Sequence, residues 1–338
     1  AMRRPSAASL PPASPARPSR RLAGNLGCAA AVAAALLVLA ACGADDPVVD
    51  DPLPPPDPAD GFQVSMEADV PAGAELWQCK VSEIPTVEFT PVNYVESVQT
   101  AGVHHMDVMA LAFANVDLAP GTYECADLYR DYPQLMEDGL IIYAAQQAEQ
   151  HIKLPEGTIA NLPGSLKIMQ ELHYVNATNV DAHAFSKINI YRYTGTADQQ
   201  IWGGAVRDTN LNIPPGESTE WTRCVMSDDV DVLFLSSHTH ALGVNFEIRA
   251  FDGTDVGELL YSNSDWATPS LLSFDEQPLH VPAGQGFEFS CHFDNLTDQT
   301  VHWGFSAAEE MCQIAYVFTP GFADHKCNVV ETSDGVLP

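Results

Sequence analysis

Short stretches in which apolar and polar residues alternate recur along the chain after residue 62. Residues 187–191 (Lys-Ile-Asn-Ile-Tyr) and 246–250 (Phe-Glu-Ile-Arg-Ala) have this two-residue period, which is typical of a strand with one buried face. Turns that contain Gly and Pro separate such stretches. Only residues 132–150 have a pattern that suits a short helix. Many short strands with frequent turns predict an all-β fold of sandwich or jelly-roll type.

The first 42 residues have the pattern of an export signal. They contain five Arg and no acidic residue, and an apolar run at 26–41 ends in Leu39-Ala40-Ala41-Cys42, which resembles a bacterial lipobox. This resemblance implies cleavage before Cys42 and a lipid on its sulfur. The alternative is an uncleaved anchor helix, but a membrane span needs about 20 residues and the run is shorter. Gly43 after the cysteine suggests the outer membrane of a Gram-negative bacterium.

Residues 43–61 read as a linker. Six Asp and six Pro lie among residues 43–60, and this composition predicts an extended, disordered tether. The folded part then begins near Phe62. A turn-rich segment near 194–200 divides it, so we expect domains at 62–196 and 197–338.

The charge of the chain excludes some partners. It has 15 basic and 45 acidic residues, and without residues 1–42 the remainder has a net charge of −35. So negative a surface repels nucleic acid and anionic lipid headgroups. We therefore expect no nucleic-acid partner and a membrane contact only through the N-terminal lipid.

Six cysteines remain after those of the signal and the lipobox are set aside. An even number in an exported chain predicts three disulfides, and the sequence alone allows 15 pairings. The six are Cys79, Cys125, Cys224, Cys291, Cys312 and Cys327.

Histidines form two candidate metal-binding motifs. In His238-Thr239-His240 both imidazoles can reach one metal, because alternate residues of a strand share a face. In His104-His105 the neighbours point to opposite faces of a regular strand, so a shared metal requires a bulge. Each motif alone is as readily explained by surface or core histidines; their joint presence with His173 favours a metal function.

The ordered set of motifs resembles the copper type II, ascorbate-dependent monooxygenases. The family includes peptidylglycine α-hydroxylating and dopamine β-monooxygenases, and the resemblance covers roughly residues 62–327. The motifs are, in order, His104-His105-Met106, His173-Tyr174, Ile213-Pro214-Pro215-Gly216-Glu217, His238-Thr239-His240 and Glu310-Met311-Cys312.

This resemblance implies two consecutive antiparallel β-sandwich, jelly-roll-like domains with one copper each, facing each other across a solvent cleft. His104, His105 and His173 would hold the first copper; His238, His240 and the thioether of Met311 would hold the second. Two imidazoles and a soft thioether suit copper, Cu(I) in particular. In isolation Met311 reads as a core methionine.

The implied activity is hydroxylation of a C–H bond in a small organic substrate. The enzyme would use O₂ and a one-electron donor such as ascorbate, and two coppers would store the two electrons. The family pattern also implies the disulfides Cys79–Cys125, Cys224–Cys327 and Cys291–Cys312.

The chain departs from the peptide-amidating branch at two positions. Ser236 and Ala315 stand where that branch has a basic residue and a Tyr, so a peptide carboxylate would lose its clamp. Glu171 resembles the dopamine-hydroxylating branch, although a structural carboxylate explains it equally well. Two other functions stay open: a copper-binding surface lipoprotein without catalysis, and a two-domain jelly-roll hydrolase that processes glycans with paired carboxylates.

Overall fold

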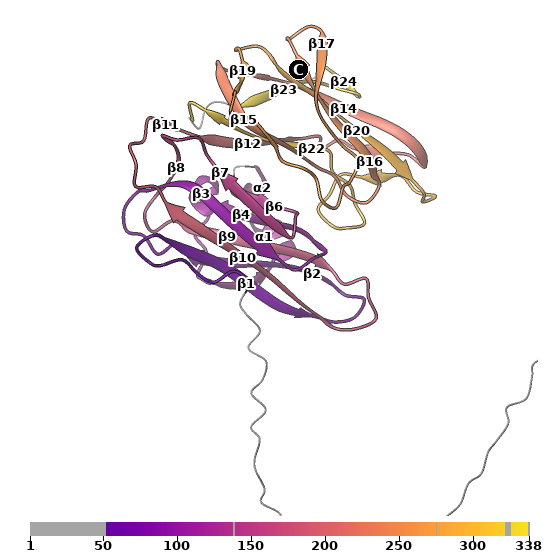
Figure 1. Cartoon of the computed structure of the whole chain (residues 1–338). Helices are drawn as coiled ribbons and strands as arrows, with labels where there is room; N and C mark the ends of the chain where they lie inside the picture. The colour runs from indigo at the N-terminus through magenta and orange to yellow at the C-terminus, as the bar shows by residue number, and fades with distance from the viewer. Residues whose placement is uncertain (1–51, 138, 275, 322–325, 337–338) are drawn as a thin grey trace, which may run out of the picture. The chain divides into compact units, whose positions relative to one another are not determined.

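The computed structural model describes residues 52–137, 139–274, 276–321 and 326–336. The prediction of an all-β protein is confirmed, since strands dominate the described part and the helices are short (Figure 1). None of the helices in these residues is long and apolar enough to span a membrane. The predicted signal peptide and Cys42 lie outside the described residues.

The first half of the chain forms two sheets. One has the order β1-β10-β3-β8-β11, with β7 on β3, and the other has the order β5-β2-β9-β4-β6. The strands are β1 Gly61–Val70, β2 Glu75–Glu83, β3 Thr90–Gln99, β4 Val103–Ala110, β5 Gly121–Glu124, β6 Leu140–Ala145, β7 Glu149–Lys153, β8 Thr158–Leu162, β9 Lys167–Val175, β10 Ala182–Arg192 and β11 Gln199–Gln200. Buried side chains from both sheets form the core between them, among them Val64, Ile188, Val108 and Leu172.

The second half of the chain also forms two large sheets, with the orders β12-β22-β15-β18 (and β19 on β15) and β17-β16-β20-β14-β23-β24, and a small β13-β21 pair. The strands are β12 Trp202–Arg207, β13 Asn212–Ile213, β14 Gly216–Met226, β15 Val230–His238, β16 Gly243–Phe251, β17 Val256–Asn263, β18 Leu272–Ser273, β19 Leu279–Val281, β20 Gly286–Asn295, β21 Val301–His302, β22 Gln313–Thr319, β23 Cys327–Thr332 and β24 Gly335–Val336. In β20, Phe287, Phe289 and Phe293 alternate with less buried residues and face the core.

The helical segments are α1 (Cys125–Asp131), α2 (Gln134–Glu137) and the 3₁₀ turn η1 (Leu111–Ala114). The segment 132–150, which the sequence pattern left open to a helix, contains only α2 and then β6 and β7. Its Leu-Ile-Ile-Tyr run pairs with β4, as β-branched and aromatic residues favour.

The prediction of a disordered linker is wrong for its last residues. Leu53 is buried, and its carbonyl accepts a hydrogen bond from the Gln63 amide at 2.8 Å. The Pro54 carbonyl accepts one from Asn189 at 2.9 Å. The Asp60 carbonyl also accepts the Arg192 N–H at 2.8 Å, so residues 52–60 lie against β1 and β10 despite the charge of the segment.

The strand pairing changes from one half to the other within a few residues. β11 still pairs with β8 of the first half, whereas β12 pairs with β22 of the second. The division at residues 196 and 197, and the jelly-roll connectivity, stay predictions.

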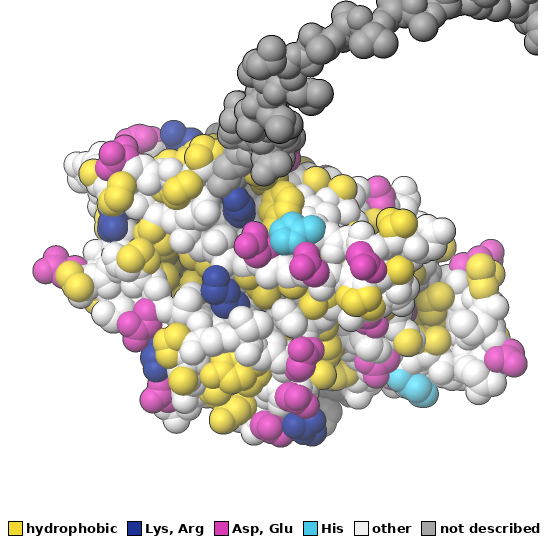
Figure 2. Space-filling model, turned by 90° about the horizontal axis from the view of Figure 1, so that it is seen from below, with side chains coloured by type: hydrophobic (Ala, Val, Ile, Leu, Met, Phe, Trp, Pro, Cys, Tyr) yellow, Lys and Arg dark blue, Asp and Glu magenta, His cyan; other side chains and the backbone are white. Residues whose placement is uncertain are grey.

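Three disulfides join Cys79 to Cys125, Cys224 to Cys327 and Cys291 to Cys312. These are the pairs that the family resemblance implied. All six residues are buried, so the bonds are part of the two cores. On the face in Figure 2, acidic side chains are spread among apolar and uncharged ones, in keeping with the acidic composition.

Candidate metal centre

A bulge in β4 brings two neighbouring histidines to one site. The β4–β9 ladder pairs Val103 with Tyr174 and then His105 with His173, so His104 is the extra residue of the bulge. A bulged residue lies outside the strict alternation of the strand. His104 can therefore face the same side as the cross-strand pair of His105 and His173, as the sequence analysis required.

His238 and His240 stand at the end of a strand in the second half. His238 is the last residue of β15, and the chain turns directly after His240, whose carbonyl accepts the Gly243 N–H at 3.1 Å. Both side chains leave the sheet where its regular pairing stops.

The five histidines lie together. The ring nitrogens of His104, His105 and His173 lie within 4.8 Å of one another, and so do those of His104, His238 and His240. His104 belongs to both groups, and its ring centroid lies 4.7 Å from that of His240. The two histidine sets are therefore in direct contact in this structure, whereas the family resemblance implied two sites that face each other across a cleft.

Polar neighbours fix which nitrogen of each ring faces the cluster. His173 donates its Nε2 hydrogen to Glu75 Oε1 at 2.7 Å, so its Nδ1 faces His105. His238 donates from Nδ1 to Gln146 Oε1 at 2.9 Å, and His240 donates from Nδ1 to the Glu309 carbonyl at 2.9 Å. Hydrogen bonds of this kind orient metal-binding histidines and set their tautomers.

Several buried imidazole nitrogens have no hydrogen-bond partner among the described residues. They are both nitrogens of His104, Nδ1 of His105 and Nε2 of His240. Unpaired buried polar atoms are costly, and convergent ones fit a metal ion. Imidazole nitrogen suits copper, zinc, nickel and iron. The site therefore fits a bound metal, with copper among the candidates.

Burial keeps most of these rings neutral, as metal binding requires. Burial and the neighbouring rings lower the pKa of His104 and His238 far below the ordinary value. They lower the pKa of His173 to about 4, and burial lowers that of His240 to about 4.

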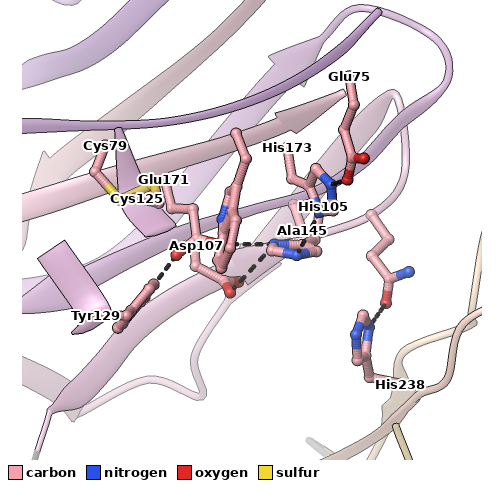
Figure 3. A network of polar contacts seen from close by, with 12 residues as sticks. Glu75, Cys79, His105, Asp107, Cys125, Tyr129, Ala145, Glu171, His173 and His238 are labelled. Carbon is pink, nitrogen blue, oxygen red and sulfur yellow. Dashed lines mark hydrogen bonds and ion pairs between the residues drawn. A yellow bond between two sulfur atoms is a disulfide. The ribbon is translucent and has the colours of Figure 1, made fainter. Parts of the chain in front are cut away.

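His105 differs because acidic groups surround it (Figure 3). Burial lowers its pKa, but the neighbouring carboxylates of Asp107 and Glu171 outweigh burial and raise it. Its Nδ1 lies 3.4 Å from Asp107 Oδ2 and 3.8 Å from Glu171 Oε1. Glu171 also accepts hydrogen bonds from Trp77 Nε1 at 2.6 Å and from the Tyr129 hydroxyl at 2.7 Å.

Glu171 is therefore a positioned, buried carboxylate beside a candidate ligand. From the sequence, Glu171 resembles the dopamine-hydroxylating branch or is a structural carboxylate. In this structure both of its oxygens have protein partners, which favours the structural interpretation.

Met311 is buried and lines the same cavity as His105 and His238. The residue before it, Glu310, is fully buried, and its carboxylate accepts backbone N–H groups of His240 at 2.8 Å, Leu242 at 2.8 Å and Met311 at 2.9 Å. One carboxylate thus ties together the two segments that carry His240 and Met311.

Sequence reasoning missed the role of Glu310, although the Glu310-Met311-Cys312 motif contained it. A buried acid directly before a candidate ligand is the signal that could have identified it. Burial raises the pKa of Glu310 to about 7, against the effect of the three N–H groups.

A cavity of about 600 Å³ adjoins the histidines. Side chains from both halves line it, and most of them are apolar, for example Ile142, Leu154, Phe234 and Leu271. Such an enclosure suits a small organic ligand.

The remaining described histidines make contacts elsewhere. His183 pairs with Asp69, His280 with Asp231, His151 with Tyr94 and His292 with Thr219. His302 belongs to the short strand β21, and His325 lies outside the described residues.

Residues 204–333 match the sequence model of the C-terminal domain of the copper type II ascorbate-dependent monooxygenases. This stretch contains His238, His240 and Met311. No curated protein matches the chain significantly.

Solved structures give only distant likenesses. The major capsid protein P2 of bacteriophage PM2 has a TM-score of 0.31 and 10% identity over 77% of this chain and 100% of its own. PNGase F, a glycosylasparaginase from Flavobacterium meningosepticum, has a TM-score of 0.31 and 9% identity over 77% of this chain and 96% of its own. TM-scores this low support no conclusion about the chain.

We predict that Glu310→Gln weakens metal binding by His238 and His240 more than by His105 and His173. An amide nitrogen cannot accept a hydrogen bond, so at least one backbone N–H loses its partner, at a cost of about 1–3 kcal/mol in unfolding free energy. Copper titration and chemical denaturation measure the two effects. Glu309→Gln is the control, because it alters an exposed side chain and keeps the carbonyl that His240 uses. Equal effects of the two variants would argue against a positioning role.

Proposed function

Because residues 204–333 match the C-terminal domain of the copper type II ascorbate-dependent monooxygenases, we propose that the protein is a copper-dependent monooxygenase. It would hydroxylate a C–H bond of a small organic substrate with O₂ and a one-electron donor, ascorbate being the donor in the family description. The observation that carries the proposal is the group of five mostly neutral histidines, four of them buried and His238 partly buried. Three of them, His104, His105 and His240, have unpartnered ring nitrogens.

We assign the ligands to two coppers. His104, His105 and His173 bind the first; His238, His240 and Met311 bind the second. In support, each candidate histidine other than His104 has one ring nitrogen directed to a carboxylate, amide or carbonyl, which leaves the other for a metal.

The reaction balances with two external electrons. The substrate C–H bond, one O₂, two electrons and two protons give one C–OH group and one water, so two molecules of a one-electron donor are consumed. When bound, two coppers supply this chemistry by storing one electron each.

The protein contributes position and enclosure. Gln146 comes from the first half of the chain and His238 from the second, so their hydrogen bond holds ligands of both halves together. The apolar cavity beside His238 and Met311 keeps water away from the reacting C–H bond and holds the substrate.

We predict that the copper-free protein takes up two equivalents of copper. A stoichiometry of one, or a preference for zinc under reducing conditions, would contradict the paired site. Oxygen uptake with ascorbate and candidate substrates then separates an enzyme from a copper-binding protein: two bound coppers with no substrate-dependent uptake would favour the second.

We predict that Met311→Ile stays folded and binds copper but loses most turnover. Isoleucine keeps the apolar bulk, and volume-conserving apolar exchanges cost under about 1.5 kcal/mol. X-ray absorption of the reduced protein measures the copper–sulfur shell directly. The shell is expected in the native protein and not in the variant. If the native protein lacks a copper–sulfur shell, Met311 is a core residue and not a ligand.

We also propose that the protein is exported and anchored to the outer membrane through a lipid on Cys42. Cys42→Ser is expected to move the protein from the membrane fraction to the soluble fraction without a change in copper binding. An unchanged membrane fraction would instead favour an uncleaved N-terminal helix.

A further inference from the structure

One face of the β12–β22–β15 sheet forms part of the cavity wall. Across these strands Arg207 pairs with Gln313, and Gln313 pairs with His238. Directly paired residues have their side chains on the same face of a sheet. The guanidinium of Arg207, the amide of Gln313 and a candidate copper ligand therefore stand in one row, and all three residues line the cavity.

The next row along the same face consists of small residues. Ala205 pairs with Ala315, and Ala315 pairs with Ser236. Two residues further on, Gly203 pairs with Val317 and Val317 pairs with Phe234, and these residues line the cavity too. The face thus has a polar row at the metal, a row of small side chains beside it and an apolar end.

The opposite side of this sheet explains why the pattern is so regular. Val206, Ile314 and Leu235 alternate with the cavity residues and lie in the core of the second half. The core fixes the three strands, so the cavity row is held on a rigid support.

Arg207 is the uncompensated charge of this wall. No described carboxylate lies within ion-pair distance of its guanidinium, and no described residue accepts a hydrogen bond from it. Burial lowers its pKa, and the charge of Asp107 acts in the opposite direction from a longer distance. Arg207 is partly buried, and a partly desolvated cation without an ion-pair partner favours the binding of an anion.

The acids of the cavity are in a different situation. Glu171 accepts hydrogen bonds from Trp77 and Tyr129, and Asp107 lies against His105. Their charges already have partners, so a cationic substrate finds no free acid there, whereas an anionic one finds Arg207.

We propose that the substrate is an apolar organic acid whose carboxylate binds Arg207 while its hydrocarbon body lies over the small row of Ala205, Ala315 and Ser236. The proposal rests on the proposed function and names its substrate class. A guanidinium recognises a carboxylate through two parallel hydrogen bonds.

The register also limits where oxidation can occur. Arg207 and His238 are separated by two interstrand spacings, about 10 Å between their Cα atoms. The hydroxylated carbon is therefore several bonds from the carboxylate rather than next to it. The small side chains of the middle row leave room for the chain of carbons between.

The test measures binding to the copper-free protein by calorimetry, so it does not depend on turnover. The probes are phenylbutyrate, phenylbutanol and phenylbutylamine, which share an apolar body and differ in the end group. We expect the acid to bind most tightly and Arg207→Gln to weaken its binding by about 10- to 100-fold, with little effect on the alcohol. Equal binding of the three probes, tighter binding of the amine, or no binding of any would overturn the proposal.

Arg249→Gln is the matched control. It also removes one positive charge, but Arg249 pairs with Glu247 and does not line the cavity. If both variants lose the same affinity for the acid, the loss comes only from the change in net charge, and the proposal is overturned. Should Arg207→Gln not fold, Arg207→Lys keeps the charge; it is expected to retain the preference for the acid with weaker binding, and loss of that preference counts against the site.

Copper uptake and oxygen consumption are measured separately. Acid binding that depends on Arg207 in a protein that takes up no copper would refute the proposed function and support this binding site. Copper-dependent hydroxylation of an amine or alcohol, without acid binding that depends on Arg207, would support the proposed function and refute this binding site.

Discussion

The close packing of five imidazole rings is the constraint on which the site depends: burial favours the neutral form of four of them, whereas Asp107 and Glu171 raise the pKa of His105. Burial and the neighbouring rings lower the pKa of His104, His173, His238 and His240, because a second positive charge in this volume would be repelled by the first. The unpaired nitrogens that result are the groups that a metal ion satisfies. The carboxylate, amide and carbonyl partners around the rings then serve one purpose, the choice of the nitrogen that faces the cluster.

Other contacts in the second half of the chain hold the segments that carry His240 and Met311 in place. The disulfide Cys291–Cys312 joins β20 to the residue after Met311, and Glu310 binds the backbone on both sides of the site. Because Glu310 holds segments that are 70 positions apart in the chain, it converts two turns into one structural unit. The weakest candidate ligand, a neutral thioether, thus lies where the backbone is most constrained.

The β12–β22–β15 sheet joins the candidate metal site to the rest of the cavity wall. Its buried side belongs to the core, and its other side has a charged, a small and an apolar row in succession. Ser236 and Ala315, which distinguish this chain from the peptide-amidating branch, both fall in the small row. Both residues line the cavity next to Phe234 and Val317, while Arg207 supplies a charge from a strand on which the sequence indicated no functional residue.

The sequence by itself determined the all-β class and the strands around residues 187–191 and 246–250, because alternation is a local pattern. Its ordered motifs also indicated the family that residues 204–333 match and a set of candidate ligands, because such motifs follow chain order. It also stated the condition for His104 and His105 to act together, a bulge, but not its presence. Only the tertiary structure decided the rest. The register of β4 on β9 created the bulge, the contact of the two halves joined the histidine sets through His104, and the pairing of three strands set Arg207 in line with His238. Each of these depends on which backbone hydrogen bonds form between segments far apart in the chain. The spacing of residues along the sequence does not predict that pairing.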